Sequence, residues 1–337
     1  MIDILVAGGG PAGLAAAIRA AAAGLEAVVV EPRPAPVDKA CGEGIMPSGV
    51  AALRALGVAP EGRELRGIRY VEGSRQAEAA FKGRSGLGVR RTELHAALHR
   101  RAAELGVRVV AGRAGEVTQG RDSVTAAGLT ARWLIAADGL HSPVRRALGL
   151  DRRPGAPRRY GLRRHYRIAP WTDFVEVHWS RHGEAYVTPV GEGLVGVAVL
   201  SRHRRSHEQH LAAFPALAAA LRGLEAGPVR GAGPLRQSAV APAAGRVLLA
   251  GDAAGYVDAL TGEGVALATA TACAAVDCLL AGRPEAYPAR WARLTRRHRL
   301  LTGALLGAAG HPLTAGLIVP AAHRLPPLFN AAVRALQ

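Results

Sequence analysis

Cysteine, lysine and aromatic side chains are scarce in this sequence of 337 residues, of which aromatic residues make up 4%. Three cysteines are too few for a disulfide framework, and the chain opens on an apolar run without a signal peptide, so we expect a reducing, cytoplasmic location. Only two residues are lysine, while arginine brings the formal net charge to +17. No nucleic-acid-binding motif or aromatic-studded basic stripe accompanies this charge, and we expect no nucleic-acid partner.

Long uncharged runs are also rare. The longest, residues 300–322, is about the length of a membrane span. Six glycine or proline residues interrupt it, so we predict two short helices that cover a pocket, with a monotopic membrane contact as the alternative. With 49% hydrophobic and 20% charged residues, the composition is typical of a globular protein with one large or two modest domains.

A glycine-rich turn lies between two apolar runs near the start of the chain. The turn, residues 8–13 (Gly-Gly-Gly-Pro-Ala-Gly), follows apolar residues 2–6 and precedes small residues at 14–23 that predict a helix. A second buried strand at 28–30 then ends at Glu31. Strand, glycine turn, helix and strand in this order predict the βαβ unit of a dinucleotide-binding fold.

The residues of this unit suit a dinucleotide ligand. Gly8 permits the tight turn, Gly10 lets the backbone approach a pyrophosphate, and Gly13 lets the helix pack closely on the strand. The helix start adds unpaired N–H groups and a positive dipole end. Glu31 can accept hydrogen bonds from ribose hydroxyls and disfavours a 2′-phosphate, which favours FAD or NAD over NADP.

Other stretches combine glycine with residues that bind ligands. Residues 39–45 surround Cys41 with glycines, which indicates close approach to a ligand, although an ordinary turn with a buried thiol is an equal alternative. Asp138 follows a buried strand at 133–137, and Asp252 follows another at 246–250. Both aspartates are therefore expected at the carboxyl ends of parallel strands, where doubly wound sheets bind ligands.

Alternating patterns predict additional strands and helices. Four antiparallel strands are predicted at 160–168, 173–180, 184–190 and 194–200, with a helix at 207–221 after them. A strand pair is predicted at 67–71 and 77–81, and a helix capped by Thr92 follows it.

Taken together, the glycine turn with Glu31, Arg91, Asp138-Gly139 and Gly251-Asp252 resemble the FAD-dependent oxidoreductases of the para-hydroxybenzoate hydroxylase type. That group includes aromatic monooxygenases, geranylgeranyl reductases and flavin halogenases. The resemblance covers about residues 1–285. It implies an α/β fold with a Rossmann-like FAD-binding domain of the GR2 type and an inserted antiparallel-sheet substrate domain.

The implied domain organisation has four parts. An FAD-binding domain at 1–150 includes a small strand insertion near 63–90, and a substrate-binding antiparallel sheet occupies 151–240. The FAD-binding domain returns at 241–285, and helices at 286–337 cover the pocket.

The resemblance also implies roles for individual residues. Glu31 would bind the adenosine ribose, Arg91 the phosphate region of FAD, and Asp252 the ribitol, with Asp138 beside the nucleotide. No metal ligand is expected. The complete set of expected cofactor-binding residues is Gly8, Gly10, Pro11, Ala12, Gly13, Glu31, Arg33, Cys41, Gly42, Arg91, Asp138, Gly251, Asp252, Gly262, Gly264 and Val265.

Two features indicate different branches of this group. Residues 41–44 (Cys-Gly-Glu-Gly) resemble the geranylgeranyl reductases, in which a cysteine of the matching loop lies near the flavin, so Cys41 is the candidate catalytic residue. Against that branch, residues 186–191 keep only the tyrosine and proline of the reductase motif YxWxFPK, and the C-terminal region is shorter than in lipid reductases.

Halogenation is disfavoured because no WxWxIP-like stretch is present, with Lys39 as the lysine to test.

We therefore expect an FAD-dependent oxidoreductase that uses NADH or NADPH as a transient electron donor, since no second dinucleotide motif is present. A monooxygenase that hydroxylates or epoxidises a hydrophobic aromatic or polyketide-like molecule is favoured. The alternatives are a geranylgeranyl-reductase-like reductase of C=C bonds and a non-catalytic flavin-binding or redox-sensing protein. A monomer or homodimer is expected. Candidate substrate contacts, each with a purely structural alternative, are Tyr166, His178, Trp179 and Tyr186.

Overall fold

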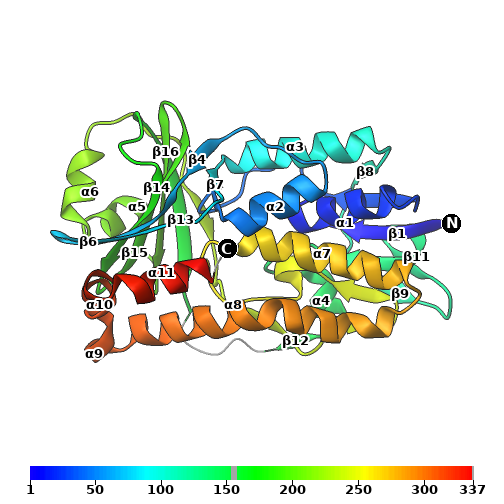
Figure 1. The fold of residues 1–337 in the computed structure, drawn as a ribbon. Helices are drawn as coiled ribbons and strands as arrows, with labels where there is room; N and C mark the ends of the chain where they lie inside the picture. Colours follow the sequence, from blue (N-terminus) through cyan, green and yellow to red (C-terminus); the bar gives the residue numbers. More distant parts are fainter. Residues whose placement is uncertain (153–157, 336–337) are drawn as a thin grey trace.

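Two large sheets, one at each end of the molecule, organise the chain in the computed structural model (Figure 1), which describes residues 1–152 and 158–335. The first sheet has the strand order β19-β20-β11-β1-β2-β8, with β10 paired to β11 and β9 paired to β10. All contacts among β20, β11, β1, β2 and β8 are parallel, as the predicted βαβ unit requires. The bounds are β1 (Ile2–Ala7), β2 (Ala27–Glu31), β8 (Arg108–Ala111), β9 (Val117–Gln119), β10 (Val124–Ala126), β11 (Leu129–Ala136), β19 (Ala243–Ala244) and β20 (Val247–Leu249).

Helices α1 (Pro11–Ala21), α3 (Arg91–Glu104) and α7 (Gly264–Leu280) pack together against one face of this sheet. Small residues let α1 lie close to both β1 and α7, and the shared core is rich in alanine. Helix α3 begins at Arg91 with Arg90 at its N-cap, so the predicted Thr92 cap is wrong; no side chain caps this helix. The backbone N–H of Arg91 instead donates to the buried carboxylate of Glu43.

The second sheet has seven strands in the order β17-β13-β16-β15-β14-β5-β6. It contains the four predicted antiparallel strands together with the predicted 67–81 pair, which joins the sheet through a parallel contact between β5 and β14. The strand insertion expected in the FAD-binding domain therefore belongs in part to this seven-stranded sheet. The bounds are β5 (Gly67–Glu72), β6 (Arg75–Ala80), β13 (Tyr160–Arg167), β14 (Phe174–Ser180), β15 (Gly183–Gly191), β16 (Leu194–Ser201) and β17 (Arg230–Ala232).

Short elements connect the two large sheets. One three-stranded sheet has the order β3-β7-β4 and the other the order β12-β18-β21. The predicted helix at 207–221 is two helices, because Pro215 begins a new one at its first turn. The bounds are β3 (Gly44–Ile45), α2 (Pro47–Ala55), β4 (Arg63–Leu65), β7 (Gly86–Gly88), α4 (Pro143–Ala147), β12 (Asp151–Arg152), α5 (His207–Leu211), α6 (Pro215–Ala220), β18 (Gln237–Ala239) and β21 (Gly255–Tyr256).

The C-terminal region differs from the prediction of two short helices. Helix α8 (Tyr287–Gly310) runs beneath both large sheets and includes Gly303 and Gly307, and α9 (Pro312–Ala315), α10 (Ile318–Arg324) and α11 (Pro326–Arg334) follow it (Figure 1). A helix interior tolerates glycine at a cost of about 1 kcal/mol each, which packing of α8 against α7 can offset. Among the described residues, no single helix has both the length and the apolarity of a membrane span, whereas the bent pair 284–310 and 313–324 passes the same test jointly.

Candidate active site

A single cavity of about 1310 Å³ runs from the glycine turn after β1 to the inner face of the seven-stranded sheet. It is lined by most of the residues expected to bind FAD, and also by Tyr186. Gly13 and Gly251 do not line it. The expected cofactor-binding residues on its wall are Gly8, Gly10, Pro11, Ala12, Glu31, Arg33, Cys41, Gly42, Arg91, Asp138, Asp252, Gly262, Gly264 and Val265.

Three of the four glycines of the turn, Gly8, Gly10 and Gly13, occupy different environments. Gly8 has a φ of +99°, and a Cβ on it would lie 2.6 Å from the carbonyl oxygen of Ala137. A Cβ on Gly13 would lie 1.8 Å from the carbonyl oxygen of Gly8, so only glycine lets α1 approach the turn this closely. Gly10 instead faces open space, with its nearest neighbour, an Arg91 nitrogen, 3.8 Å from an added Cβ. The second glycine therefore leaves room for a ligand between α1 and Arg91.

Glu31 ends β2 with its carboxylate buried beside the turn. Its Oε2 accepts a hydrogen bond of 2.8 Å from the Gly9 N–H, and its Oε1 accepts one of 2.6 Å from Arg33 Nε. Burial opposes the charged form, but the hydrogen bonds from Arg33 and Gly9 outweigh it and hold the pKa of Glu31 below its usual value. The carboxylate is thus ionised and fixed where a ribose would be recognised.

Two buried polar atoms on the cavity wall test whether the site fits FAD. Arg91 Nε and Asp138 Oδ1 have no hydrogen-bond partner in the part of the chain that the structure describes, although Asp138 Oδ2 accepts from the Val144 N–H at 3.0 Å. Buried polar groups are rarely left unpaired. Arg91 Nε is a donor beside the open space at Gly10, and Asp138 Oδ1 is an acceptor at the end of β11. The first suits phosphate oxygens and the second suits hydroxyl groups, and FAD has both.

Asp252 lies where β20 meets the N-terminal side of α7, in the turn Gly251–Ala253. Gly251 holds this turn by donating its N–H to Thr271 Oγ1 at 3.0 Å. Burial raises the pKa of Asp252, while the positive charges of Lys39 and Arg91 oppose that rise. Burial also lowers the pKa of Lys39, as do the nearby guanidinium groups of Arg33 and Arg91. These opposite charges mark the polar part of the cavity.

Glu43 holds the loop that carries Cys41 through contacts with α3 and with the seven-stranded sheet. This residue has a φ of 59°, in the left-handed region that side chains other than glycine seldom adopt. Its Oε1 accepts from the Arg91 N–H at 2.9 Å, and its Oε2 lies 2.6 Å from His165 Nε2 on β13. Thr188 on β15 donates its hydroxyl to the Gly42 carbonyl at 2.8 Å. The loop is therefore fixed between α3 and the seven-stranded sheet.

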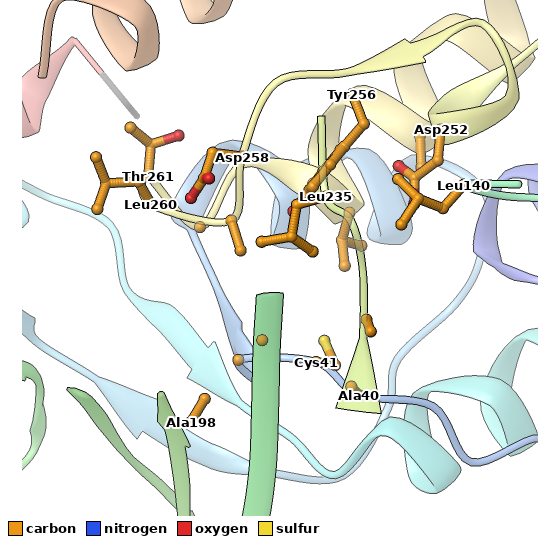
Figure 2. A pocket seen from close by; sticks show the side chains of 18 of the residues that line it. Ala40, Cys41, Leu140, Ala198, Leu235, Asp252, Tyr256, Asp258, Leu260 and Thr261 are labelled. Atoms are coloured by element: carbon orange, nitrogen blue, oxygen red, sulfur yellow. The ribbon is translucent and has the colours of Figure 1, made fainter. Parts of the chain in front are cut away.

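Cys41 lies on one wall of the cavity, and Asp252, Tyr256 and Asp258 lie on the facing wall (Figure 2). Burial raises the pKa of the Cys41 thiol, so it carries its proton at neutral pH. A protonated thiol here is a weak hydrogen-bond donor toward the space between the walls.

Beyond Cys41 the cavity widens into an apolar chamber. Its walls come from the inner face of the seven-stranded sheet and from the C-terminal helices, and polar side chains are few. The chamber is therefore suited to a hydrophobic molecule. Representative lining residues are Ile68, Val175, Val177, Leu200, Leu235, Leu260, Leu301, Leu305, Phe329 and Val333.

A buried ion cluster at the edge of the chamber was not predicted. Arg159 lies between Glu184 and Asp258, with its Nε 3.2 Å from Asp258 Oδ2. Asp258 Oδ1 is buried without a hydrogen-bond partner in the described chain, and Asp258 lines the cavity. Burial raises the pKa of Asp258 to about 6 against the opposing charge of Arg159, and the charge of Glu184 adds to the rise. Asp258 follows the expected cofactor-binding residue Asp252 by six residues, and this closeness in sequence could have indicated that Asp258 also lines the site.

Of the four candidate substrate contacts, only Tyr186 lines the cavity, and its hydroxyl donates to the Leu260 carbonyl at 3.2 Å. Tyr166 lies on the opposite face of the sheet, with its ring centroid 6.2 Å from that of His207. His178 lies 3.1 Å from a Glu176 oxygen, also away from the cavity. Trp179 shares the face of Val175 and Val177, but Tyr70 packs edge-on against it and lines the cavity in its place.

This combination of fold, glycine turn and unpaired ligand-facing atoms defines a dinucleotide-binding flavoprotein. Residues 1–215 match the family model described as FAD binding domain, and the chain belongs to that family as an FAD-dependent oxidoreductase. The menaquinone reductase of Mycolicibacterium smegmatis is 33% identical to this chain over 334 residues, which are 88% of this chain and 80% of the relative. The menaquinone reductase of Mycobacterium tuberculosis is 33% identical over 302 residues, which are 78% of this chain and 72% of the relative.

Solved structures show the same fold. A flavoprotein/dehydrogenase from Cytophaga hutchinsonii superposes with a TM-score of 0.83 at 18% identity, over 99% of this chain and 92% of the other. A geranylgeranyl bacteriochlorophyll reductase-like protein from Thermoplasma acidophilum superposes with a TM-score of 0.77 at 22% identity, over 97% and 91% of the two chains. These similarities confirm the predicted Rossmann-like fold with its second sheet.

The open space at Gly10 generates a first prediction. Gly10→Leu should fill the space beside Arg91 and reduce the FAD content of the purified protein at least tenfold, while circular dichroism shows an intact fold. Gly193→Leu is the matched control, because a Cβ there meets no heavy atom within 4 Å and the residue is exposed and does not line the cavity. A Gly10→Leu protein with full FAD content would refute the assignment of the turn.

Cys41 generates a second prediction. Cys41→Ser should retain FAD but change the flavin absorbance spectrum or the turnover rate, because Cys41 lines the cavity between the glycine turn and the apolar chamber. Cys273→Ser serves as the control, since Cys273 is on α7 and does not line the cavity. An unchanged spectrum and rate for Cys41→Ser would leave Cys41 as a structural thiol.

Proposed function

We propose that this FAD-dependent oxidoreductase reduces a carbon–carbon double bond in a hydrophobic substrate with an isoprenoid chain. The observation that carries the proposal is the direct opening of the FAD-binding part of the cavity into an apolar chamber, with the Cys41 thiol where the two parts meet and the buried carboxyl of Asp258 at the edge of the chamber. The relatives named menaquinone reductase support this substrate class, because a menaquinone carries an isoprenoid chain.

The residues of the chamber suit this reaction. FAD, when bound and reduced, supplies two electrons and one hydrogen. The second carbon of the double bond must then receive a proton from an acid of the protein. Asp258 has an unpaired oxygen on the cavity wall, and Arg159 and Glu184 fix its position. The chamber walls are mostly apolar, so few other side chains could give this proton.

NADH or NADPH is the proposed electron donor. A transient contact is sufficient for this step, because the sequence carries no second glycine-rich dinucleotide motif. The donor would approach the cavity, reduce the bound cofactor and leave before the hydrophobic substrate is converted.

A second candidate is an NAD(P)H-dependent monooxygenase acting on a hydrophobic aromatic or polyketide-like molecule. It is favoured by β15, which presents Tyr186 and Pro189 but lacks the tryptophan, phenylalanine and lysine of the reductase motif. The same apolar chamber would hold such a molecule.

Product analysis distinguishes these candidates. The holoprotein is incubated with NADPH or NADH and a prenylated naphthoquinone, once without oxygen and once under ¹⁸O-labelled dioxygen, and products are analysed by mass spectrometry after air oxidation. We expect a product with two added hydrogens in both cases, because air oxidation restores a reduced ring but not a saturated chain. A product that needs dioxygen and carries the label would establish the monooxygenase. No reduction of the flavin by either nucleotide, and no product, would favour a non-catalytic flavoprotein.

The unpaired carboxyl of Asp258 generates a pH prediction. If it donates the proton, turnover should fall as pH rises through about 6, because the carboxyl loses its proton there. Asp258→Asn should lower turnover about a hundredfold, within the range of general acid catalysis, and should abolish this pH dependence while FAD content stays constant. Asp122→Asn is the control, since the Asp122 side chain is 82% exposed. An Asp258→Asn protein with the wild-type rate and profile would exclude this role.

A further inference from the structure

Large apolar side chains are exposed in a short segment at the C-terminus. We define the C-terminal cap as residues 300–334, the end of α8 with α9, α10 and α11. Soluble monomers usually expose such residues singly, and a group of them marks an interaction site. The cap exposes Leu300 at 63%, Leu313 at 77%, Leu317 at 58%, Leu325 at 52% and Leu328 at 64%.

The same segment forms a wall of the apolar chamber. Leu325 and Leu328 line the cavity although each is more than half exposed, and Ala321 and Ala332 are also exposed lining residues. The chamber therefore reaches the surface between α10 and α11, at the end of the molecule where the cap packs against β6 (Figure 1). A hydrophobic substrate entering there would pass exposed leucines.

The C-terminal segment carries charge of one sign. Residues 286–337 contain seven arginines and no aspartate or glutamate. Arg293, Arg296, Arg297 and Arg299 are exposed on α8, and Arg324 is exposed at the end of α10. The exposed loop after β16 adds Arg202, whose guanidinium would lie 2.4 Å from a Cβ placed on Gly310.

We propose that the C-terminal cap docks on the surface of an anionic lipid bilayer, so that the mouth of the chamber opens toward the lipid. Exposed leucines supply apolar area that can enter the interface, and arginines supply attraction to acidic headgroups, the two contributions that peripheral membrane contact requires. A second copy of the chain fits this face poorly, because pairing two caps would bring like charges together with no acidic residue of this segment between them.

Vesicle flotation of the FAD-loaded protein tests this proposal. We expect the protein to float with phosphatidylcholine vesicles that contain phosphatidylglycerol, to float much less with phosphatidylcholine alone, and to be released by high salt. The double variant Leu313→Gln/Leu317→Gln should lower the fraction bound to anionic vesicles at least tenfold. Neither leucine lines the cavity, so FAD content and turnover of a detergent-solubilised substrate should be unchanged.

A matched double variant, Val240→Gln/Leu280→Gln, changes two exposed apolar residues outside the cap and should bind vesicles as the wild type does. Three results would overturn the proposal: wild-type protein that stays in solution with anionic vesicles, cap variants that bind as tightly as wild type, or a wild-type dimer by light scattering that the cap variants convert to monomers. Vesicle binding is measured without turnover, so a failure of the proposed reductase function leaves this test unaffected.

Discussion

The buried carboxylate of Glu43 is the contact on which the geometry of the cavity depends. It bridges the first residue of α3, on the cofactor side, and His165 on the substrate sheet. A Cβ on Gly196 would lie 2.9 Å from its Oε2, so a larger residue at this point of the neighbouring strand β16 would displace the carboxylate. The hydrogen bonds that fix the Glu43 side chain compensate for the unfavourable backbone conformation of this residue, and they set the position of Cys41 two residues before it.

The parts of the cavity on the two sides of Glu43 differ in polarity. Toward the glycine turn the cavity is polar, with Glu31 ionised and with Arg91 and Asp138 presenting unpaired atoms. Toward the cap it is apolar, and Asp258 is a buried acid held by Arg159. The part of the cavity suited to FAD therefore adjoins a part suited to a hydrophobic molecule. This division suits a reaction in which electrons arrive from one side and the substrate enters from the other.

Local patterns predicted much of this arrangement. The βαβ unit, the four antiparallel strands and the aspartate at the end of β11 depend on nearby residues, and each was found as expected. The pairing of β5 with β14 was missed, because it joins strands more than one hundred residues apart and neither strand's alternation specifies its neighbour. Strand alternation predicts that Glu176 and Val175 lie on opposite faces of the sheet, but it does not say which face borders a cavity. The candidate substrate contacts therefore included Tyr166 and His178, which do not line the cavity.

The most direct test of the account is a single-turnover experiment on the reduced holoprotein without oxygen. The flavin absorbance is followed after mixing with a prenylated naphthoquinone or with the same quinone carrying a saturated chain. If an isoprenoid double bond is the acceptor, the unsaturated chain should reoxidise the flavin at least tenfold faster and leave a product with two added hydrogens in its chain. Equal rates with both quinones, or rapid reoxidation by oxygen alone, would contradict the account.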